Sequence, residues 1–427
     1  MGQTFRNREA RPDAKAMGNR SLTAQENIIM KILVVNVGST SLKFRLFDMA
    51  DERVVAVGKV DRVGSPSSVV TWQIGNQSRK EEEIQCGSQR VAIEHVLKIL
   101  THPIEGVLSA LDELDAIGFK PVHAKNIADS VFVTPEVIGA MEEYVPLAPA
   151  HNPPYIEAFR IFQELLPQKP LVGVFEPAFH RTIPDYARTY GIPFEWSEKH
   201  AIRRYGFHGA SHRYISWRAP QLAGLPAKDL RIISCHLGGS SSLCAIKDGV
   251  SVDTSMGFSP QSGLPNTNRN GDLDPFILLY MMEKEGLTVQ EIRTALSKNG
   301  GLKGISGLSG DLRDLEEGAA KGNPRAALAL KVLVHETRKY IGAYTAVLGG
   351  LDVLAFTGGI GENGCSVRES ICDRLECLGI QLDPVKNTLR GQDGVISGEE
   401  SRVKVVVILA NEELVIARET ARLLQAK

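Results

Sequence analysis

Two stretches of the chain, about 200 positions apart, share one pattern of apolar and polar residues. Each has an apolar run, a turn rich in Gly and Ser, and a second strand-like run, at 32–35, 36–41 and 43–47 and again at 231–235, 236–242 and 243–246. A buried strand, a Gly/Ser turn and a returning strand predict a β-hairpin. Two such hairpins predict a duplicated domain.

Helical patterns follow each hairpin, at 88–100 in the first half and at 324–348 in the second. The second helix has ordinary boundary signals, with Asn323 as N-cap, Pro324 at the first helical position and Gly349 at the end. Both halves therefore read as mixed α/β. A final strand and helix at 403–424 can pack back onto the first half.

Prolines interrupt the pattern at 146–154, 177 and 184, which places the domain crossover near residue 178. We predict a first lobe over 30–178 plus 413–427 and a nucleotide-binding second lobe over 179–412. Residues 1–29 are polar and basic without an apolar segment, so they do not form a secretory signal. We expect a disordered leader there, with a targeting or docking tail as the alternative.

Composition narrows the class of protein. The 427 residues suffice for two or three domains, and 43% hydrophobic with 23% charged residues excludes disordered and fibrous chains. The net charge of -1 gives no global signal for nucleic acid or an anionic membrane. Six cysteines without a Cys-x-x-Cys pair favour reduced thiols. We expect a soluble cytoplasmic protein with neither nucleic-acid nor membrane partners.

Three Gly/Ser-rich segments follow buried strands, at 36–41, 236–242 and 357–363. Such turns let backbone N–H groups approach a phosphate, and three of them favour a nucleotide held between two lobes. The third segment also fits the dinucleotide-binding Gly-x-Gly-x-x-Gly over 359–364, with Asp383 beyond it. A nicotinamide dehydrogenase is therefore an alternative, although it leaves the repeated hairpins unexplained.

The centre of the chain is rich in histidine and arginine. Seven of the ten histidines lie between 123 and 236, but none has the spacing and third ligand that zinc enzymes use. Residues 203–212 combine cations, imidazoles and glycines, and Arg269 lies within a polar loop, which suits an anionic group. Glu176 and Glu412 are candidates to hold magnesium, which takes few protein carboxylates.

Five segments resemble the acetate kinase (acetokinase) family: NVGSTSLK at 36–43, PAHNP at 149–153, RYGFHGASH at 204–212, VDTSMG at 252–257 and FTGGIGEN at 356–363. The similarity runs from Met30 to the C-terminus and includes 304–314 and 411–414. It implies the duplicated α/β fold of acetate and sugar kinases, heat-shock ATPases and actin, with a nucleotide cleft between two lobes. It also implies a homodimer that catalyses reversible phosphoryl transfer from ATP to acetate.

The resemblance implies roles for matching residues. His208 would hold the transferring phosphoryl group, Arg269 would bind its charge and the carboxylate, and Lys120 and Glu176 would complete the catalytic group. Asn36 and Glu412 would hold Mg²⁺. The implied substrate pocket consists of Val122, Ala150, His151, Phe207 and Pro260. The implied ATP site consists of Asn36, Ser39, Ser41, Lys43, His236, Gly238, Gly239, Ser240, Asp311, Arg313, Gly358, Gly359, Ile360, Gly361 and Asn363.

The chain departs from the family pattern at five places. Lys120 stands for an arginine, Glu176 for an aspartate, and Gly239 for an asparagine near phosphate. Residues 266–268 alter the neighbours of Arg269, and Ala150 replaces a leucine in the pocket for the methyl group of the acid. Because charge type is retained at Lys120 and Glu176, we expect an active kinase that accepts acetate, propionate or a larger acid. The alternatives are an impaired nucleotide-binding relative and a changed donor such as pyrophosphate.

Overall fold

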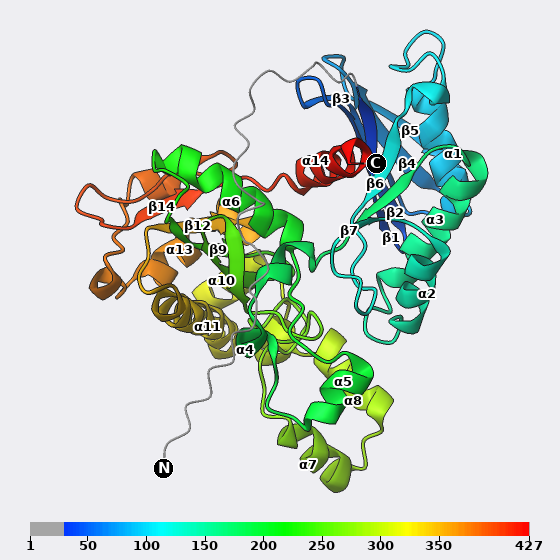
Figure 1. Cartoon of the computed structure of the whole chain (residues 1–427). Coiled ribbons are helices and arrows are strands. Elements are labelled where there is room, and N and C mark those ends of the chain that lie inside the picture. Colours follow the sequence, from blue (N-terminus) through cyan, green and yellow to red (C-terminus); the bar gives the residue numbers. More distant parts are fainter. Residues whose placement is uncertain (1–29, 427) are drawn as a thin grey trace, which may run out of the picture.

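The computed structural model describes residues 30–426, which form two α/β lobes side by side (Figure 1). The predicted leader at 1–29 lies outside the described residues. The first lobe contains an eight-stranded sheet in the order β5-β4-β3-β2-β1-β6-β8-β7. Its strands are β1 (Lys31–Gly38), β2 (Ser41–Asp48), β3 (Arg53–Asp61), β4 (Ser68–Ile74), β5 (Lys80–Ile84), β6 (Ala116–Phe119), β7 (Ser130–Phe132) and β8 (Leu171–Val174).

The second lobe contains a six-stranded sheet in the order β11-β10-β9-β12-β14-β13. Its strands are β9 (Arg231–His236), β10 (Ser242–Lys247), β11 (Val250–Thr254), β12 (Val353–Thr357), β13 (Gly394–Val395) and β14 (Lys404–Val407). Both sheets contain three antiparallel strands, then two parallel strands and a short antiparallel strand at the edge, and the first sheet adds the antiparallel strands β4 and β5 at its other edge. The order β3-β2-β1-β6-β8-β7 matches the whole second sheet, so the predicted duplication and actin-like fold class are confirmed.

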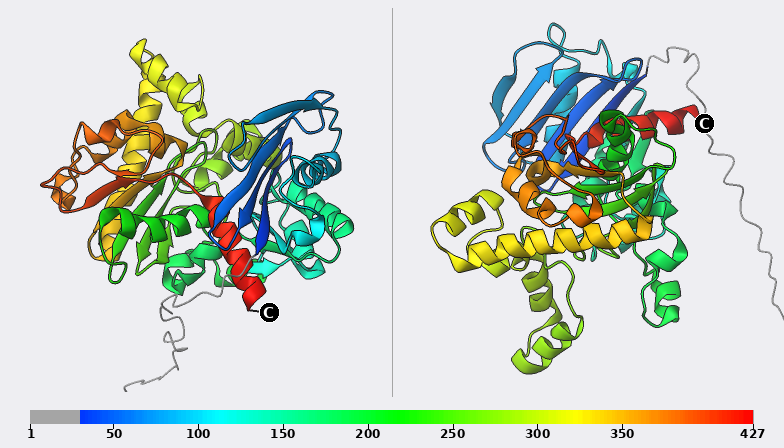
Figure 2. Two further views of the ribbon diagram at one scale, coloured as in Figure 1. Left: turned by 90° about the horizontal axis from the view of Figure 1, so that it is seen from above. Right: turned by 90° about the vertical axis from the view of Figure 1, so that its left-hand side faces the viewer.

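Helices cover both faces of each sheet. In the first lobe α1 (Gln89–Leu100), α2 (Pro135–Glu143) and α3 (Asn152–Leu165) pack on one face. The other face is covered by α14 (Glu412–Gln425), where Ile416 and Ala417 contact Ile32 and Val34. Figures 1 and 2 both show α14, in red, against the strands of the first lobe. The chain therefore returns to its first lobe, as 403–424 predicts.

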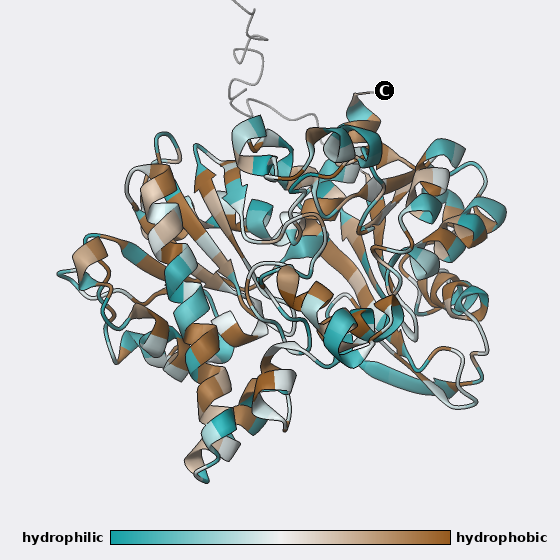
Figure 3. Cartoon of the chain, turned by 90° about the horizontal axis from the view of Figure 1, so that it is seen from below, coloured by the Kyte–Doolittle hydropathy of each residue, from teal (hydrophilic) through white to brown (hydrophobic). Residues whose placement is uncertain are grey.

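In the second lobe α6 (Gly209–Ala223) packs on one face of the sheet. The other face is covered by α9 (Gly301–Ser306), α10 (Leu312–Ala320), α11 (Pro324–Leu348) and α13 (Cys365–Cys372). Figure 3 shows apolar strands inside both lobes and hydrophilic positions on the helices outside. Each sheet lies within one predicted lobe segment, and we keep the boundaries at 178 and 412 as a proposal.

Two short helical projections leave the second lobe (Figure 1). One contains α4 (Asp185–Arg188) and α5 (Phe194–His200), and the other contains α7 (Phe276–Glu285) and α8 (Val289–Lys298). Helices α5, α7 and α8 bury none of their residues. In the part of the chain that is described, no helix is both long and apolar enough to cross a membrane.

Two of the predicted phosphate turns differ from the structure. Residues 36–38 belong to β1, so the first hairpin turns at Ser39 and Thr40 alone. Residues 358–363 form a helix, α12 (Gly358–Asn363), rather than a loop. The backbone N–H of Gly358 donates to Glu362 at 3.0 Å, and those of Ile360 and Gly361 donate to the Leu237 carbonyl at 2.9 and 3.1 Å. These bonds satisfy the first turn and stabilise a helix despite its glycines.

Gly118 in β6 permits α14 to lie close to the sheet. A Cβ atom at this position would lie 2.6 Å from Thr420 Oγ1 and 2.9 Å from Ile416 Cγ2. Both are β-branched residues with restricted χ1 rotation, so neither side chain can move away easily. Any larger residue at 118 would displace the helix that begins with Glu412.

We therefore expect Gly118→Ala to destabilise the protein by about 1 to 3 kcal/mol, the usual cost of overpacking a core. Urea unfolding measures this change. Gly342 in α11 is the matched control, because a Cβ there meets nothing within 4 Å. Gly342→Ala should stabilise the helix by up to about 1 kcal/mol. Equal unfolding midpoints for parent and Gly118→Ala would contradict the close packing of α14.

Candidate active site

Twelve residues from both lobes line a cavity of about 190 Å³: Asn36, Val37, Lys120, Val122, His151, Tyr155, Glu176, Phe207, His208, Ser240, Pro260 and Arg269. The structure thus brings together all four predicted catalytic residues and four of the five predicted substrate-binding residues. Ala150 is the exception. Its side chain is exposed and does not line the cavity, so its predicted place as a wall of the pocket is wrong.

The reason is local. Ala150 lies in the turn before α3, where it is exposed. Ala148, two positions earlier, is buried instead and packs with Val122, Phe207 and Met256. Val122 and Phe207 line the apolar end of the cavity, and Ala148 and Met256 pack behind them.

The polar end of the cavity lies where three parallel strands end. β1, β6 and β8 are parallel neighbours, and Asn36, Lys120 and Glu176 lie at or just after their carboxyl ends. Ligands bind at this edge in α/β sheets because the loops there leave a crevice. Glu412, the first residue of α14, reaches the same place from the last helix.

Lys120 is held between two carboxylates. Its ammonium donates to Glu412 Oε2 at 2.5 Å and lies 3.1 Å from Glu176 Oε1. Burial opposes the charge, but Glu176 and Glu412 outweigh it and raise the pKa of Lys120 well above its usual value. The single lysine cannot neutralise both acids equally. Burial and the Glu412 charge raise the pKa of Glu176, whereas Lys120 overcomes burial to lower the pKa of Glu412.

His208 is fixed against Glu176 through the backbone. The N–H of Gly209 donates to the Glu176 carbonyl at 3.0 Å, and a Cβ on Gly209 would lie 2.2 Å from that oxygen. Only glycine fits there. His208 itself has a left-handed backbone with φ of 56°. A non-glycine residue in this region is strained, which is typical of functional positions.

A chain of hydrogen bonds leads away from His208. Its Nδ1 lies 2.8 Å from Ser242 Oγ, which also lies 2.8 Å from Nε2 of His212. Nδ1 of His212 lies 2.9 Å from Ser234 Oγ. Ser242 has one hydroxyl proton, so it donates to one imidazole and accepts from the other. When Ser242 donates to His208, the His208 proton is on Nε2, from where it can donate to an oxyanion.

His208 is neutral at ordinary pH. Burial and the neighbouring histidines and cations lower its pKa well below the usual value. Its ring stacks on that of His236 at a centroid distance of 4.2 Å, and burial also lowers the pKa of His236. Two stacked imidazoles avoid mutual repulsion only when they are uncharged.

Arg269 supplies a cation without a counterion. Its Nη1 donates to Ser240 Oγ at 3.0 Å and to the Pro260 carbonyl at 3.3 Å. Within residues 30–426 no carboxylate pairs with it. Burial lowers the pKa of the guanidinium, although an arginine remains charged. A partly buried, unpaired cation is an arrangement that favours an anionic ligand.

The predicted nucleotide residues lie on three neighbouring segments. Gly238, Gly239 and Ser240 belong to the loop at 237–241, where β9 turns into β10. The N-terminus of α12 packs on this loop through the Leu237 carbonyl. Asp311 caps α10 and pairs with Arg313 at 2.7 Å. Of the predicted set only Asn36 and Ser240 also line the cavity.

Sequence reasoning missed several residues that support the site. Tyr155 Oη donates to Asn36 Oδ1 at 2.7 Å. Arg368 is fully buried and donates to the carbonyls of Gly361, Asn387 and Leu389 at 2.9, 2.7 and 2.8 Å. It thereby ties α12 to the segment at 387–389. No motif identifies either residue. The position of Arg368 within a helical segment is only a weak sign that its side chain could be buried.

The donor atoms fit a magnesium ion. Among the described residues no three or more His, Cys, Asp or Glu cluster as a protein-only metal site. Mg²⁺ needs only one or two carboxylates, since water and phosphate complete its shell. Glu176 Oε2 and Asn411 Oδ1 are buried without a hydrogen-bond partner. Together with Glu412 and Asn36 they provide the oxygen ligands that this ion prefers.

Comparisons with known proteins agree with this geometry. The model of the acetokinase family matches residues 31–418. An acetate kinase of Dictyoglomus thermophilum is 49% identical over 399 residues, 93% of this chain and 100% of the relative. The crystal structure of Porphyromonas gingivalis acetate kinase has a TM-score of 0.84 at 41% identity and covers 92% of this chain and 100% of its own. A propionate kinase from Francisella tularensis has a TM-score of 0.83 at 35% identity, covering 91% and 98%.

The buried histidines make stability depend on pH. Burial lowers the pKa of His180 to about 4, and the unfolded state keeps the usual value near 6.5. Between pH 6.5 and 4, His180 is protonated in the unfolded chain but stays neutral in the folded chain, because its pKa there is lower. Stability should therefore fall as pH drops from 6.5 to 4, by up to about 1.4 kcal/mol per pH unit for this residue.

Urea unfolding at pH 7.5, 6 and 5 tests this expectation. His180→Gln should give a shallower loss of stability with falling pH than the parent protein. His123→Gln is a matched second variant, because burial also lowers the pKa of His123 to about 4. The slope is the readout, since either variant can lower stability at every pH. Parallel pH profiles for parent and both variants would disprove the account.

Proposed function

Because the chain belongs to the acetokinase family and is a carboxylate kinase, we propose that the cavity transfers a phosphoryl group reversibly between ATP and acetate or propionate. One observation carries this proposal. Lys120, His208 and Arg269 converge on one end of a small cavity whose other end is apolar. A short-chain carboxylate has the same division into a charged and an apolar end.

In the forward reaction a carboxylate oxygen of the acid attacks the terminal phosphorus of ATP. The new bond joins oxygen to phosphorus, and the bond to the β-phosphate oxygen breaks to release ADP. Such transfers need positioning and charge neutralisation rather than a covalent nucleophile. Arg269 would orient the carboxylate and stabilise the charge on the equatorial oxygens, and neutral His208 would donate from Nε2 to one of them.

Asn36 and Glu412, with the free oxygen of Glu176, would hold Mg²⁺. When bound, the ion supplies charge neutralisation on the phosphate oxygens. Lys120 keeps both carboxylates oriented toward this place. The loop at 237–241, Asp311 and the segment at 358–363 would bind the phosphates and adenosine of ATP.

The preferred acid depends on the apolar end. Val122 and Phe207 line it, Ala148 and Met256 pack behind them, and Ala150 does not line the cavity. We propose that the cavity accepts propionate or a larger short-chain acid in addition to acetate. One methylene is worth about 1 to 3 kcal/mol in such a pocket, so preference rather than exclusion is expected.

A hydroxylamine trap for acyl phosphate, run with ATP, magnesium and a panel of acids, tests the function. We expect product with acetate and propionate, with less than a tenfold difference in kcat/KM.

Arg269→Ala should lower kcat by about a thousandfold or more, as loss of a charge-stabilising arginine does in phosphoryl transfer. Arg218 is the control, since it pairs with Asp393 outside the cavity, and Arg218→Ala should keep activity.

The outcomes separate the alternatives. Absence of product with every acid, in protein that binds ATP, would contradict kinase activity. Product with pyrophosphate in place of ATP, and none with ATP, would replace the proposed donor. Full activity of Arg269→Ala would remove that residue from the site.

We also propose a homodimer and a cytoplasmic location. Helix α7 presents Phe276, Ile277, Leu279 and Tyr280, which are 51% to 72% exposed, and it buries no residue within the chain. An apolar helix of this kind needs a partner, and a second copy is what the resemblance to the family implies. The six unpaired cysteines support a reducing compartment.

The substitution Phe276→Asp tests the interface on α7. Light scattering after gel filtration should give a dimer for the parent protein and a shift toward monomer for the variant. Ile104→Asp is the control, because Ile104 is 89% exposed on the other lobe, and this variant should stay dimeric. A dimer of unchanged affinity in Phe276→Asp would move the interface away from α7.

A further inference from the structure

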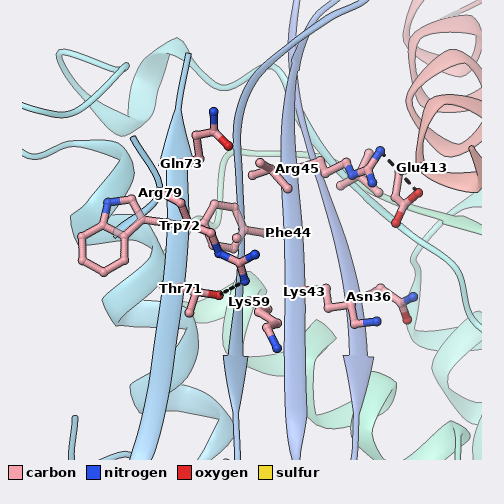
Figure 4. A pocket seen from close by; sticks show the side chains of 13 residues that line it. Asn36, Lys43, Phe44, Arg45, Lys59, Thr71, Trp72, Gln73, Arg79 and Glu413 are labelled. Carbon is pink, nitrogen blue, oxygen red and sulfur yellow. Dashed lines mark hydrogen bonds and ion pairs between the residues drawn. The ribbon is translucent and has the colours of Figure 1, made fainter. Parts of the chain in front are cut away.

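A second cavity, of about 260 Å³, lies on the sheet of the first lobe (Figure 4). It opens on the face that also carries α14, and its polar lining includes Asn36, Lys43, Arg45, Lys59, Arg79 and Glu413. The register of strands β1 to β4 explains why these polar side chains lie together. Asn36, Lys43, Lys59 and Thr71 are direct cross-strand neighbours on β1, β2, β3 and β4, so their side chains share one face.

This lining carries an excess of positive charge. Four cations face a single carboxylate, that of Glu413, which lies 3.8 Å from Arg45. Lys59 pairs with Asp61 beside the cavity. Arg79 donates only to the hydroxyl of Thr71, at 3.0 Å, and Lys43 has no ion pair among the described residues.

Lys43 and Lys59 lie directly opposite each other on neighbouring strands. Like charges in this position destabilise a sheet. A sheet face with no ligand gains nothing from the arrangement, whereas a bound polyanion would turn the repulsion into attraction to both. Figure 4 shows the guanidinium of Arg79 reaching over the same strands toward Thr71.

We propose that this cavity is a binding site for a phosphate-class anion. Ammonium groups, a guanidinium and a hydroxyl are donors that suit the several oxygens of phosphate or pyrophosphate. Arg45, Lys59 and Arg79 do not line the catalytic cavity, whereas Asn36 and Lys43 belong to the Mg²⁺ and ATP residues that the resemblance implies.

The site adjoins the reaction centre. Asn36 lines both cavities, and Lys43 lies directly opposite Asn36 on the neighbouring strand. An anion bound here therefore lies beside the group that would hold Mg²⁺. The anion has two possible sources, which are free phosphate or pyrophosphate and the terminal phosphates of a bound nucleotide.

Isothermal titration of the full chain with inorganic phosphate tests the site. The Lys59→Gln, Arg79→Gln double variant should lose one class of phosphate binding, with affinity at least tenfold weaker. Arg269→Ala should keep that class, because its own anion site is the catalytic cavity. Lys98→Gln, an exposed lysine on α1 of the same lobe, is the matched control and should bind phosphate as the parent does.

A second arm distinguishes the two sources. If KM for ATP rises tenfold in the double variant while phosphate binding is unchanged, the site serves the nucleotide's phosphates. The proposal is overturned if both are unchanged, if the parent protein binds no phosphate, or if Arg269→Ala alone abolishes all binding. Arg79→Lys retains the charge and should keep affinity within about threefold, which separates loss of charge from loss of fold.

Discussion

The ammonium of Lys120, bound between Glu176 and Glu412, is the contact on which the site depends. It joins the ends of β6 and β8 to the first residue of α14, so three elements distant in sequence are held at one point. Removing one partner from a buried ion pair typically costs about 3 to 5 kcal/mol, because a charge is then left unpaired. The same contact leaves one buried oxygen of Glu176, a residue that lines the cavity, without a hydrogen-bond partner. Lys120, Glu176 and Glu412 therefore both hold the fold together at this point and provide charged groups to the site.

Around this centre, the protonation states of the charged and titratable side chains are set by the fold before any ligand binds. Arg269 is a cation without a counterion, His208 and His236 are kept neutral by burial, and Glu412 is kept ionised by Lys120. Ordering such groups takes place during folding, so they need no reorganisation when charge shifts from donor to acceptor. The left-handed backbone of His208 and the close approach of Gly209 to Glu176 are local strains that the two lobes hold in place.

Much of this organisation could be predicted from the sequence. The repeated hairpins, the capped helix α11 and the return of the last helix are local patterns, and the structure has all of them. His208 and Arg269 could be proposed because they lie in dense polar segments, whereas Lys120 followed only from the resemblance to the family. Arg368 and Tyr155 could not, since their partners are carbonyls and a side chain far away in sequence.

Ala150 was misplaced because a motif position does not say whether a shorter side chain still reaches the cavity. The turn at 36–41 and the helix α12 differ because strand register and contacts with Leu237 override the turn preference of glycine and serine.

The position of α14 in the sequence determines when the first lobe can be completed during synthesis. This helix follows the strands of both sheets in the sequence, yet it covers one face of the first sheet and begins with Glu412. Until those residues have left the ribosome, the first lobe has an exposed apolar face and the reaction centre lacks a carboxylate. A chain that stopped before residue 412 would therefore lack part of the apolar core of the first lobe and a carboxylate of the reaction centre together.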